Sequence, residues 1–288
     1  MDPASGSFTG IARPSAGEAA WIGQMAYKLG QRSAHLTYLI SADLQDTRLL
    51  PALVEYLITQ AGAWGAFNVL AEIDERSPAF ESLRKTGFVI YSRQTVWSIP
   101  GGSENGRKGT DLRWQPADVS SAGAIRTLYN CLVPPLVQTA EPIPLQPGGL
   151  VYRQDGEVLA YVEQFHGPRG IYLLPVVHPN LDNIHDLLRA LLHHLSPVLR
   201  RPVYLAVRSY QAWLDDTLTE MGAVEAPRQS LLVRHLTQRV TAPVKNSILI
   251  PVESRAPETS SPISRQFSVH RSRRPAQFLP GTDHRIEG

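Results

Sequence analysis

The sequence has few of the features that mark secreted, membrane or nucleic-acid-binding proteins. Cys131 is the sole cysteine among 288 residues, so the chain can form no internal disulfide and no zinc site built on paired cysteines. No apolar run reaches the roughly 20 residues that a membrane-spanning helix needs, and residues 1–15 lack the apolar stretch of a signal peptide. The net charge of +2 is too small for a basic nucleic-acid surface. These absences predict a cytoplasmic protein without membrane or nucleic-acid partners.

Composition along the chain predicts its division into parts. The segment GGSENGRKGT, residues 101–110, holds no apolar residue, so we expect a linker between a domain at 16–100 and another at 111–240. Residues 241–288 are rich in Pro, Ser and Arg and have no helical or strand period, and residues 1–15 are small and polar. Too little apolar surface is available there to offset chain entropy, so both ends are predicted to be disordered.

Two segments repeat the same order of elements. A shift of 135 residues aligns them without a gap, and the matched residues include Leu53 with Leu188, Leu83 with Leu218, Gly87 with Gly222 and Gln94 with Gln229. Each segment reads as a buried strand, a helix, a second strand, a shorter helix that ends at glycine, and a final pair of hydrophobic strands. Strands that alternate with helices predict an α/β protein with a mixed sheet, present twice.

The two copies differ before this common part. The second copy has a strand, a helical stretch at 119–139 and a hairpin that turns at Asp155 and Gly156, a dipeptide suited to a type I′ turn. The first copy has only about twenty residues there. We therefore expect the first domain to lack its opening strand and helices, and the second copy to cover the exposed part of its sheet.

The order of elements resembles that of the GCN5-related N-acetyltransferase (GNAT) superfamily. Residues 69–97 are similar to the second conserved motif of that family, through the helix that ends in Thr86-Gly87-Phe88 and the strand that follows. The resemblance covers residues 21–100 and, more weakly, 111–240. It implies two tandem acyl-CoA N-acyltransferase-like domains that pack on each other, the first truncated at its N-terminus. It also implies acetyl-CoA as cosubstrate and an amine of a small molecule or peptide as acceptor.

The resemblance also assigns candidate cofactor-binding residues. In the family, acetyl-CoA binds where two central strands splay apart, and its diphosphate rests on backbone N–H groups of a glycine-rich turn at the start of the central helix. The corresponding turns here, residues 41–50 and 177–188, contain no glycine. The candidates at these turns are Thr47, Arg48, His178, Asn180, Asp182 and Asn183. At the positions of Leu83 and Leu218, members of the family often have a tyrosine that acts as the general acid.

Three carboxylates are candidates for the base that deprotonates an amine. Glu72 and Asp74 leave the end of a predicted strand, and Glu163 lies on a central strand of the second copy. The alternative is that they are solvated or capping side chains. Arg208, Tyr210 and Trp213 are candidates for pocket walls, with simple packing as the alternative.

No metal site is predicted. His185 lies eight and nine residues from His193 and His194, about two helical turns away and too far to share one ion. Two functions are left open. The first is direct acyl transfer from acetyl-CoA to an amine, with a carboxylate such as Glu163 as base. The second is a GNAT-fold binding or structural module that has lost the diphosphate turn and catalyses nothing.

Overall fold

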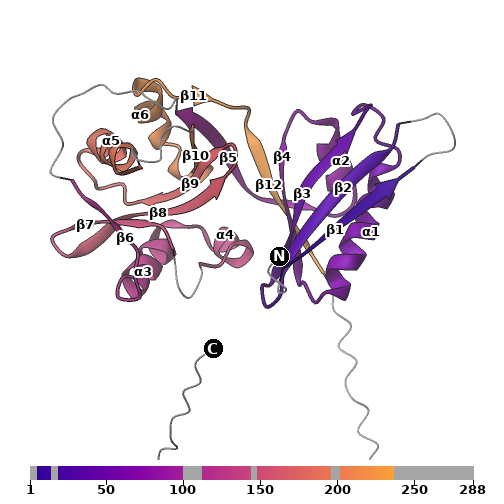
Figure 1. Cartoon of the computed structure of the whole chain (residues 1–288), viewed down its shortest axis with the longest axis horizontal. Helices are drawn as coiled ribbons and strands as arrows, with labels where there is room; N and C mark the ends of the chain where they lie inside the picture. The colour runs from indigo at the N-terminus through magenta and orange to yellow at the C-terminus, as the bar shows by residue number, and fades with distance from the viewer. Residues whose placement is uncertain (1–4, 14–18, 100–111, 144–147, 196–201, 237–288) are drawn as a thin grey trace, which may run out of the picture. The chain divides into compact units, whose positions relative to one another are not determined.

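The computed structural model describes residues 5–13, 19–99, 112–143, 148–195 and 202–236 (Figure 1). We call residues 5–99 the first half and residues 112–236 the second half. The predicted linker at 101–110 and the predicted tail at 241–288 lie outside the described residues, so both stay predictions.

The first half contains five strands and two helices among its described residues. They are β1 (Ser5–Ala12), β2 (Trp21–Lys28), β3 (Ser33–Ser41), α1 (Leu50–Ala63), β4 (Asn68–Asp74), α2 (Pro78–Lys85) and β5 (Val89–Ile99). The sequence predicts a strand pair after Gly87, whereas the structure has one long strand, β5.

The second half repeats this order after an additional strand and two additional helices. Its elements are β6 (Trp114–Pro116), α3 (Ala122–Leu132), α4 (Pro135–Ala140), β7 (Leu150–Gln154), β8 (Glu157–Gly167), β9 (Gly170–Val177), α5 (Ile184–Leu195), β10 (Val203–Arg208), the 3-10 turn η2 (Ser209–Gln211), α6 (Leu214–Glu220), β11 (Val224–Glu225) and β12 (Gln229–His235). The predicted mixed α/β fold, with its elements present twice and fewer of them in the first copy, is confirmed.

The two halves exchange their last strands within one continuous sheet. The strand order is β1-β2-β3-β4-β12-β5-β10-β9-β8-β7-β6, with β11 on the side of β5. Thus β12 of the second half pairs with β4, and β5 of the first half pairs with β10. Gln94 lies opposite Gln229, its match in the sequence repeat, so the exchange is nearly symmetric about this pair. Each half is therefore completed by a strand from the other half.

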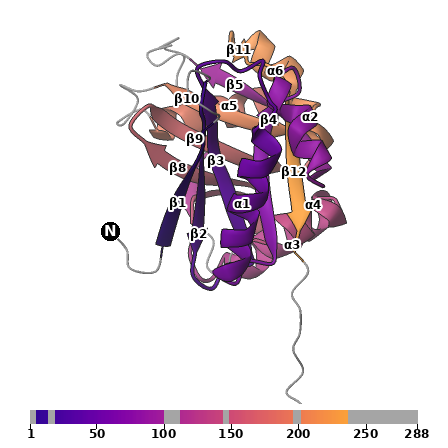
Figure 2. The ribbon, with the colours of Figure 1, turned by 90° about the vertical axis from the view of Figure 1, so that its right-hand side faces the viewer.

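Apolar spacing explains why α1 forms and where it packs. Leu50, Leu53, Val54, Leu57, Ile58 and Ala61 recur at helical spacing and are buried in the core between α1 and the strands β1 and β2. Figure 2 shows α1 lying along this part of the sheet. Pro51 lies in the first turn, where proline is tolerated. Leu49 takes the N-cap position of α1 without a side-chain hydrogen bond.

The predicted helix-ending glycines and the predicted hairpin turn are confirmed, and a serine caps α2. Ser77 caps α2 by accepting a hydrogen bond from the Ala79 N–H. Gly87 and Gly222 follow their helices with φ of +82° and +76°, a conformation that favours glycine. The hairpin of β7 and β8 turns at Asp155 and Gly156, both with positive φ, as a type I′ turn requires.

The prediction of disorder for residues 1–15 is wrong for Ser5–Ala12. These residues form β1, which pairs antiparallel with β2 along its whole length. The Phe8 ring contacts Tyr56 and Trp64 of the first half. Composition could not reveal this strand, because its ordering depends on pairing with β2 and on one well-placed aromatic side chain rather than on its own apolar content.

The second half covers part of the first, as the shorter first copy led us to expect. Ala140 of α4 packs with Leu70 of β4, Val233 of β12 and the partly buried Tyr91. No helix among the described residues has both the length and the apolar character to cross a bilayer.

Candidate functional site

Each half has one pair of parallel strands that separate before their ends. In the first half, β3 pairs with β4 only from Ser33 to Leu36. In the second half, β9 pairs with β10 only from Ile171 to Leu173. Beyond these residues each pair of strands diverges, as the family resemblance implies. We call the two places the first opening, between β3 and β4, and the second opening, between β9 and β10.

The turn that follows β3 is filled by aspartates of the chain itself. A carboxylate oxygen of Asp43 accepts a hydrogen bond from the Gln45 N–H at 2.9 Å, and one of Asp46 accepts from the Arg48 N–H at 3.2 Å. The Arg48 guanidinium also lies 2.7 Å from Asp46, and its hydrogen bond lowers the pKa of that carboxyl to about 2. Of the candidates, Arg48 is therefore paired with Asp46, and the Thr47 carbonyl accepts from the Leu50 N–H.

The turn that follows β9 is also bonded to itself. The His178 ring accepts a hydrogen bond from the Asn180 N–H at 3.2 Å, and the His178 carbonyl accepts from the Leu181 N–H at 3.3 Å. Asn183 caps α5: its side-chain oxygen lies 3.4 Å from the Asp186 N–H, and its side-chain amide donates to the Asp186 carboxylate.

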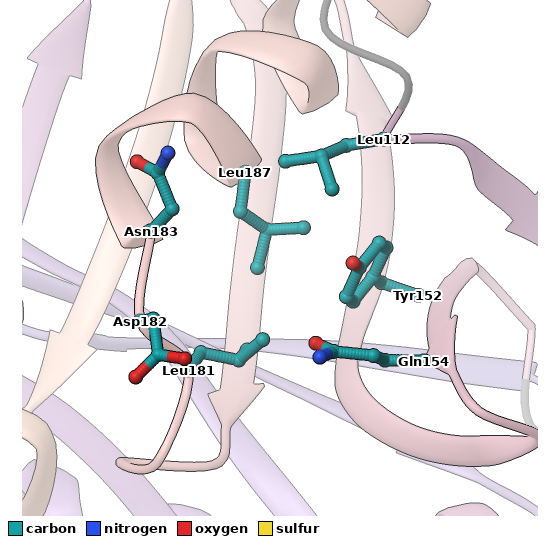
Figure 3. A pocket seen from close by; sticks show the side chains of 7 residues that line it. All are labelled: Leu112, Tyr152, Gln154, Leu181, Asp182, Asn183 and Leu187. Carbon is teal, nitrogen blue, oxygen red and sulfur yellow. The ribbon is translucent and has the colours of Figure 1, made fainter.

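A small pocket lies beside this turn, between the start of α5, the strand β7 and Leu112, which precedes β6 (Figure 3). Its volume is about 220 Å³. The side chains that line it are Leu112, Tyr152, Gln154, Leu181, Asp182, Asn183 and Leu187. Two candidates, Asp182 and Asn183, thus line this pocket. Asp182 is the charged residue among the side chains that line it.

These turns do not fit the diphosphate of acetyl-CoA. A diphosphate needs several backbone N–H groups free of other acceptors and a neutral or positive setting. In the first turn Asp43 and Asp46 take N–H groups, and in the second His178 and Asn183 do so. The carboxylates of Asp43, Asp46, Asp182 and Asp186 add negative charge where the anion would lie.

A buried glutamine occupies the second opening. The Gln211 side chain, 2% exposed, accepts a hydrogen bond from the Val177 N–H at 2.8 Å and donates one to the Pro175 carbonyl at 2.8 Å. At the matching positions of the first opening, the repeat places Ile40, Ala42 and Arg76. Within the described residues, no side chain is bonded to the backbone of Ile40 or Ala42, and Arg76 instead pairs with Asp74.

A largely buried ion pair lies beside the second opening, with 6% of the Arg208 side chain and 26% of the Glu141 side chain exposed. The Arg208 guanidinium donates to both carboxylate oxygens of Glu141 at 2.9 Å and to the Gln94 side-chain oxygen at 2.6 Å. The Tyr91 hydroxyl donates to the Glu141 carboxylate, and the Tyr129 hydroxyl donates to the Glu141 backbone carbonyl. We call these residues, Arg208, Glu141, Gln94, Tyr91 and Tyr129, the Glu141 cluster.

Glu163 lies close to this cluster. It is on β8, opposite Leu174 of β9, and burial together with the negative charge of Glu141 raises the pKa of its carboxyl. Burial likewise raises the pKa of Tyr129 and Tyr161, with the Glu163 charge adding to the shift, so both phenols keep their protons. The Tyr161 hydroxyl donates to the Gly148 carbonyl at 2.6 Å.

The other two candidate bases differ from each other. The Gln94 side-chain amide donates to a Glu72 carboxylate oxygen at 3.1 Å, which links Glu72 to the Glu141 cluster. The same amide lies 2.7 Å from the Gln229 side-chain oxygen and 3.4 Å from the Tyr172 hydroxyl. Asp74 is apart from the cluster: it accepts from the Arg76 N–H and guanidinium, which lowers its pKa, as a capping carboxylate does.

Some residues at this site were predictable from the sequence and others were not. Arg208 belongs to the cluster, and Tyr210 packs in the adjacent core, where burial raises its pKa to about 12. Trp213 is 36% exposed at the N-cap position of α6. Glu141 and Gln211 were not predicted. Each is a single polar residue that follows a helix or strand, and no spacing pattern distinguishes it from a solvated side chain.

Two further features concern catalysis and metals. Leu83 and Leu218, at the positions of the family's tyrosine acid, are buried in the cores of their halves. Within the described ranges, no group of three His, Cys, Asp or Glu side chains is placed to hold a metal ion.

Comparison with known proteins places the fold. No protein-family model matches the sequence, and no curated protein matches it. A GCN5-related N-acetyltransferase from Kribbella flavida is 13% identical with a TM-score of 0.51, covering 76% of this chain and 88% of its own. A functionally unknown conserved protein from Staphylococcus epidermidis is also 13% identical with a TM-score of 0.51, over 74% and 91% of the two chains. A tandem GNAT protein from the clavulanic acid biosynthesis pathway is 15% identical, with a TM-score of 0.47, over 81% and 84%.

The fold of this protein is therefore that of the GNAT acetyltransferases. At these identities the likeness concerns the fold, and the chemistry must be argued from the side chains described above.

Proposed function

We propose that this protein is an N-acyltransferase that transfers an acyl group to the amine of a small molecule or peptide, and that the amine binds beside the Glu141 cluster. The GNAT fold and the separation of β9 from β10 support the reaction class. The observation that carries the proposal is Glu163: a partly buried carboxyl with a raised pKa, among protonated tyrosines, next to the second opening.

An amine is protonated in neutral water and must lose a proton before it can attack an acyl group. A carboxyl whose pKa is raised toward neutrality is a better base than a solvated one, because it holds the abstracted proton more firmly. Glu163 takes this role in the proposal. Tyr129 and Tyr161 stay protonated and donate to the backbone carbonyls of Glu141 and Gly148. Arg208 neutralises Glu141, so Glu163 is the carboxylate next to the opening without an ion-pair partner among the described residues.

The acyl donor proposed is an acyl-CoA, which supplies the acyl group as a thioester. We assign no residue to its diphosphate, because the turns after β3 and β9 do not fit that group. Glu163 and the cluster concern the acceptor amine alone, and their role can be tested with any thioester donor.

The test is an acyl-transfer assay that follows release of the donor thiol over a panel of small amines and peptides. Cys131 is exposed, so its own thiol must be subtracted as background. Glu163→Gln should lower kcat/KM by about a hundredfold, which is the usual contribution of a general base. Glu157→Gln, an exposed carboxylate on the same strand, is the matched control and should leave the rate unchanged.

Equal rates for wild type and Glu163→Gln would remove Glu163 from the mechanism. Absence of transfer by the wild type to every amine in the panel would remove the transferase activity itself, leaving a binding or structural module with this fold.

A further inference from the structure

The second opening contains an occupant supplied by the chain. We propose that Gln211 is an internal ligand: its side-chain amide fills the place of an amide-bearing donor arm and must leave before that arm can bind. This inference rests on the proposed function and adds a closed state to it. It concerns the binding of the donor arm alone and involves no covalent step.

The geometry of Gln211 is that of a strand partner. In a parallel sheet, a residue donates its N–H to a carbonyl on the neighbouring strand. Its own carbonyl accepts from the N–H that lies two residues further along that strand. Gln211 bonds in this way to the Pro175 carbonyl and the Val177 N–H. Its amide therefore continues the β9–β10 pairing that stops at Leu173, and it blocks any other chain from doing so.

Gln211 is held firmly enough to compete with a ligand. The side chain is 2% exposed and Val177 is 1% exposed, so a departure of Gln211 leaves two buried backbone groups without partners. Only a ligand that offers both a donor and an acceptor at the same spacing can replace it. An extended chain with amide groups, such as the pantetheine arm of an acyl-CoA, has this chemistry, whereas an apolar acyl chain alone does not.

The first opening provides an internal comparison. Arg76 stands at the position that matches Gln211, and it is bonded to Asp74 rather than to the edge of β3. No side chain within the described residues is bonded to the backbone of Ile40 or Ala42, which match Pro175 and Val177. The internal ligand is thus a feature of the second half alone.

The experiment measures the affinity of the full chain for S-acetylpantetheine, which has the amide arm but no diphosphate, by isothermal titration calorimetry. Gln211→Ala should bind about tenfold more tightly than wild type. Only the open fraction of the wild type can bind the arm, and the apparent affinity falls in proportion to that fraction. Gln211→Met fills the same space without the hydrogen bonds and should not gain affinity. Gln164→Ala, a glutamine on the neighbouring strand, and Arg76→Ala, at the matching site of the first half, should bind as wild type does.

A second measurement uses the wild type, in case Gln211→Ala does not fold. The side-chain NH₂ protons of Gln211 should exchange slowly with solvent in the free protein, and saturation with S-acetylpantetheine should make them exchange rapidly. Binding that leaves these protons protected overturns the proposal, as does equal affinity of wild type and Gln211→Ala.

The two proposals fail in different ways. Normal acyl transfer with no effect of Gln211→Ala on arm binding overturns the internal ligand and leaves the transferase. Tighter binding to Gln211→Ala without any transfer by either protein supports the internal ligand and overturns the transferase.

Discussion

The two halves share their core elements but differ in what covers their sheets. In the second half, α3 and α4 pack on one face and enclose a core that includes Tyr161 and, nearby, Glu163. In the first half, the register of β1, β2 and β3 places Ile11, Tyr38 and Ile40 on the face opposite α1, where they are 51%, 44% and 55% exposed. The partly buried polar site lies in the second half, where α3 and α4 cover the second face of the sheet. The strands that the two halves share are therefore not enough to form it.

The largest expected effect comes from separating the halves. A truncated chain that starts at Asp111 loses β5, and with it the antiparallel partner of β10 and the core residues Trp97 and Ile99. We expect this chain to show no cooperative unfolding by circular dichroism, because β10 becomes an unpaired edge strand once β5 is removed. Addition of a peptide with the sequence of residues 88–99 should restore part of the transition. A sharp transition of the truncated chain alone would show that the strand exchange is dispensable.

The next effect compares one arginine from each half. Arg208→Met leaves Glu141 as an unpaired, largely covered charge and should lower the free energy of unfolding by about 3–5 kcal/mol. Arg48→Met removes an exposed pair with Asp46 and should leave the urea midpoint unchanged. If the two midpoints shift equally, the buried cluster contributes no more than a surface ion pair does.

A third comparison uses leucines that the repeat aligns. Leu57 of α1 is fully buried, whereas its match in α5, Leu192, is partly exposed. Leu57→Ala should lower the free energy of unfolding by about 2–5 kcal/mol through lost burial and a cavity. Leu192→Ala should have a clearly smaller effect in the same urea titration. The opposite order would mean that the two helices pack differently from what their burial indicates.

The smallest effect is the pH dependence due to Glu163. Burial raises the pKa of its carboxyl in the folded state, so its contribution to stability is fully present below the unfolded pKa and is lost as the pH rises through the folded pKa. Glu163→Gln should therefore be more stable relative to wild type at pH 7 than at pH 4. Urea unfolding of both proteins at the two pH values measures this difference. A difference that is constant with pH would show that Glu163 titrates as a solvated carboxyl does.

Much of the local structure was predictable because its causes are local. Apolar spacing identified α1 and α5, and Gly87 and Gly222 marked helix ends. The match of Gln94 with Gln229, found by a numerical shift, proved to be a contact between their side chains. The candidate site was predicted less completely. Glu163 and Glu72 were named, while Glu141, which stands between Arg208 and the tyrosines, was not.

The unpredicted features all depend on distant segments. β1 is ordered by β2, and the second opening is closed by Gln211, which lies 36 residues from Pro175 in the sequence. A glutamine in a short turn has the same sequence signature whether it points into a sheet or into water. Only the path of the chain determines which.

The sequence by itself determined the repeated order of strands and helices, because periods of two and 3.6 residues and their caps act within a few residues. The tertiary structure decided which strand completes which sheet and what fills the space between diverging strands. β5 and β12 follow matching glycines and contain the matched residues Gln94 and Gln229, so each carries much the same strand signal. Long-range pairing alone placed β12 beside β4 and β5 beside β10.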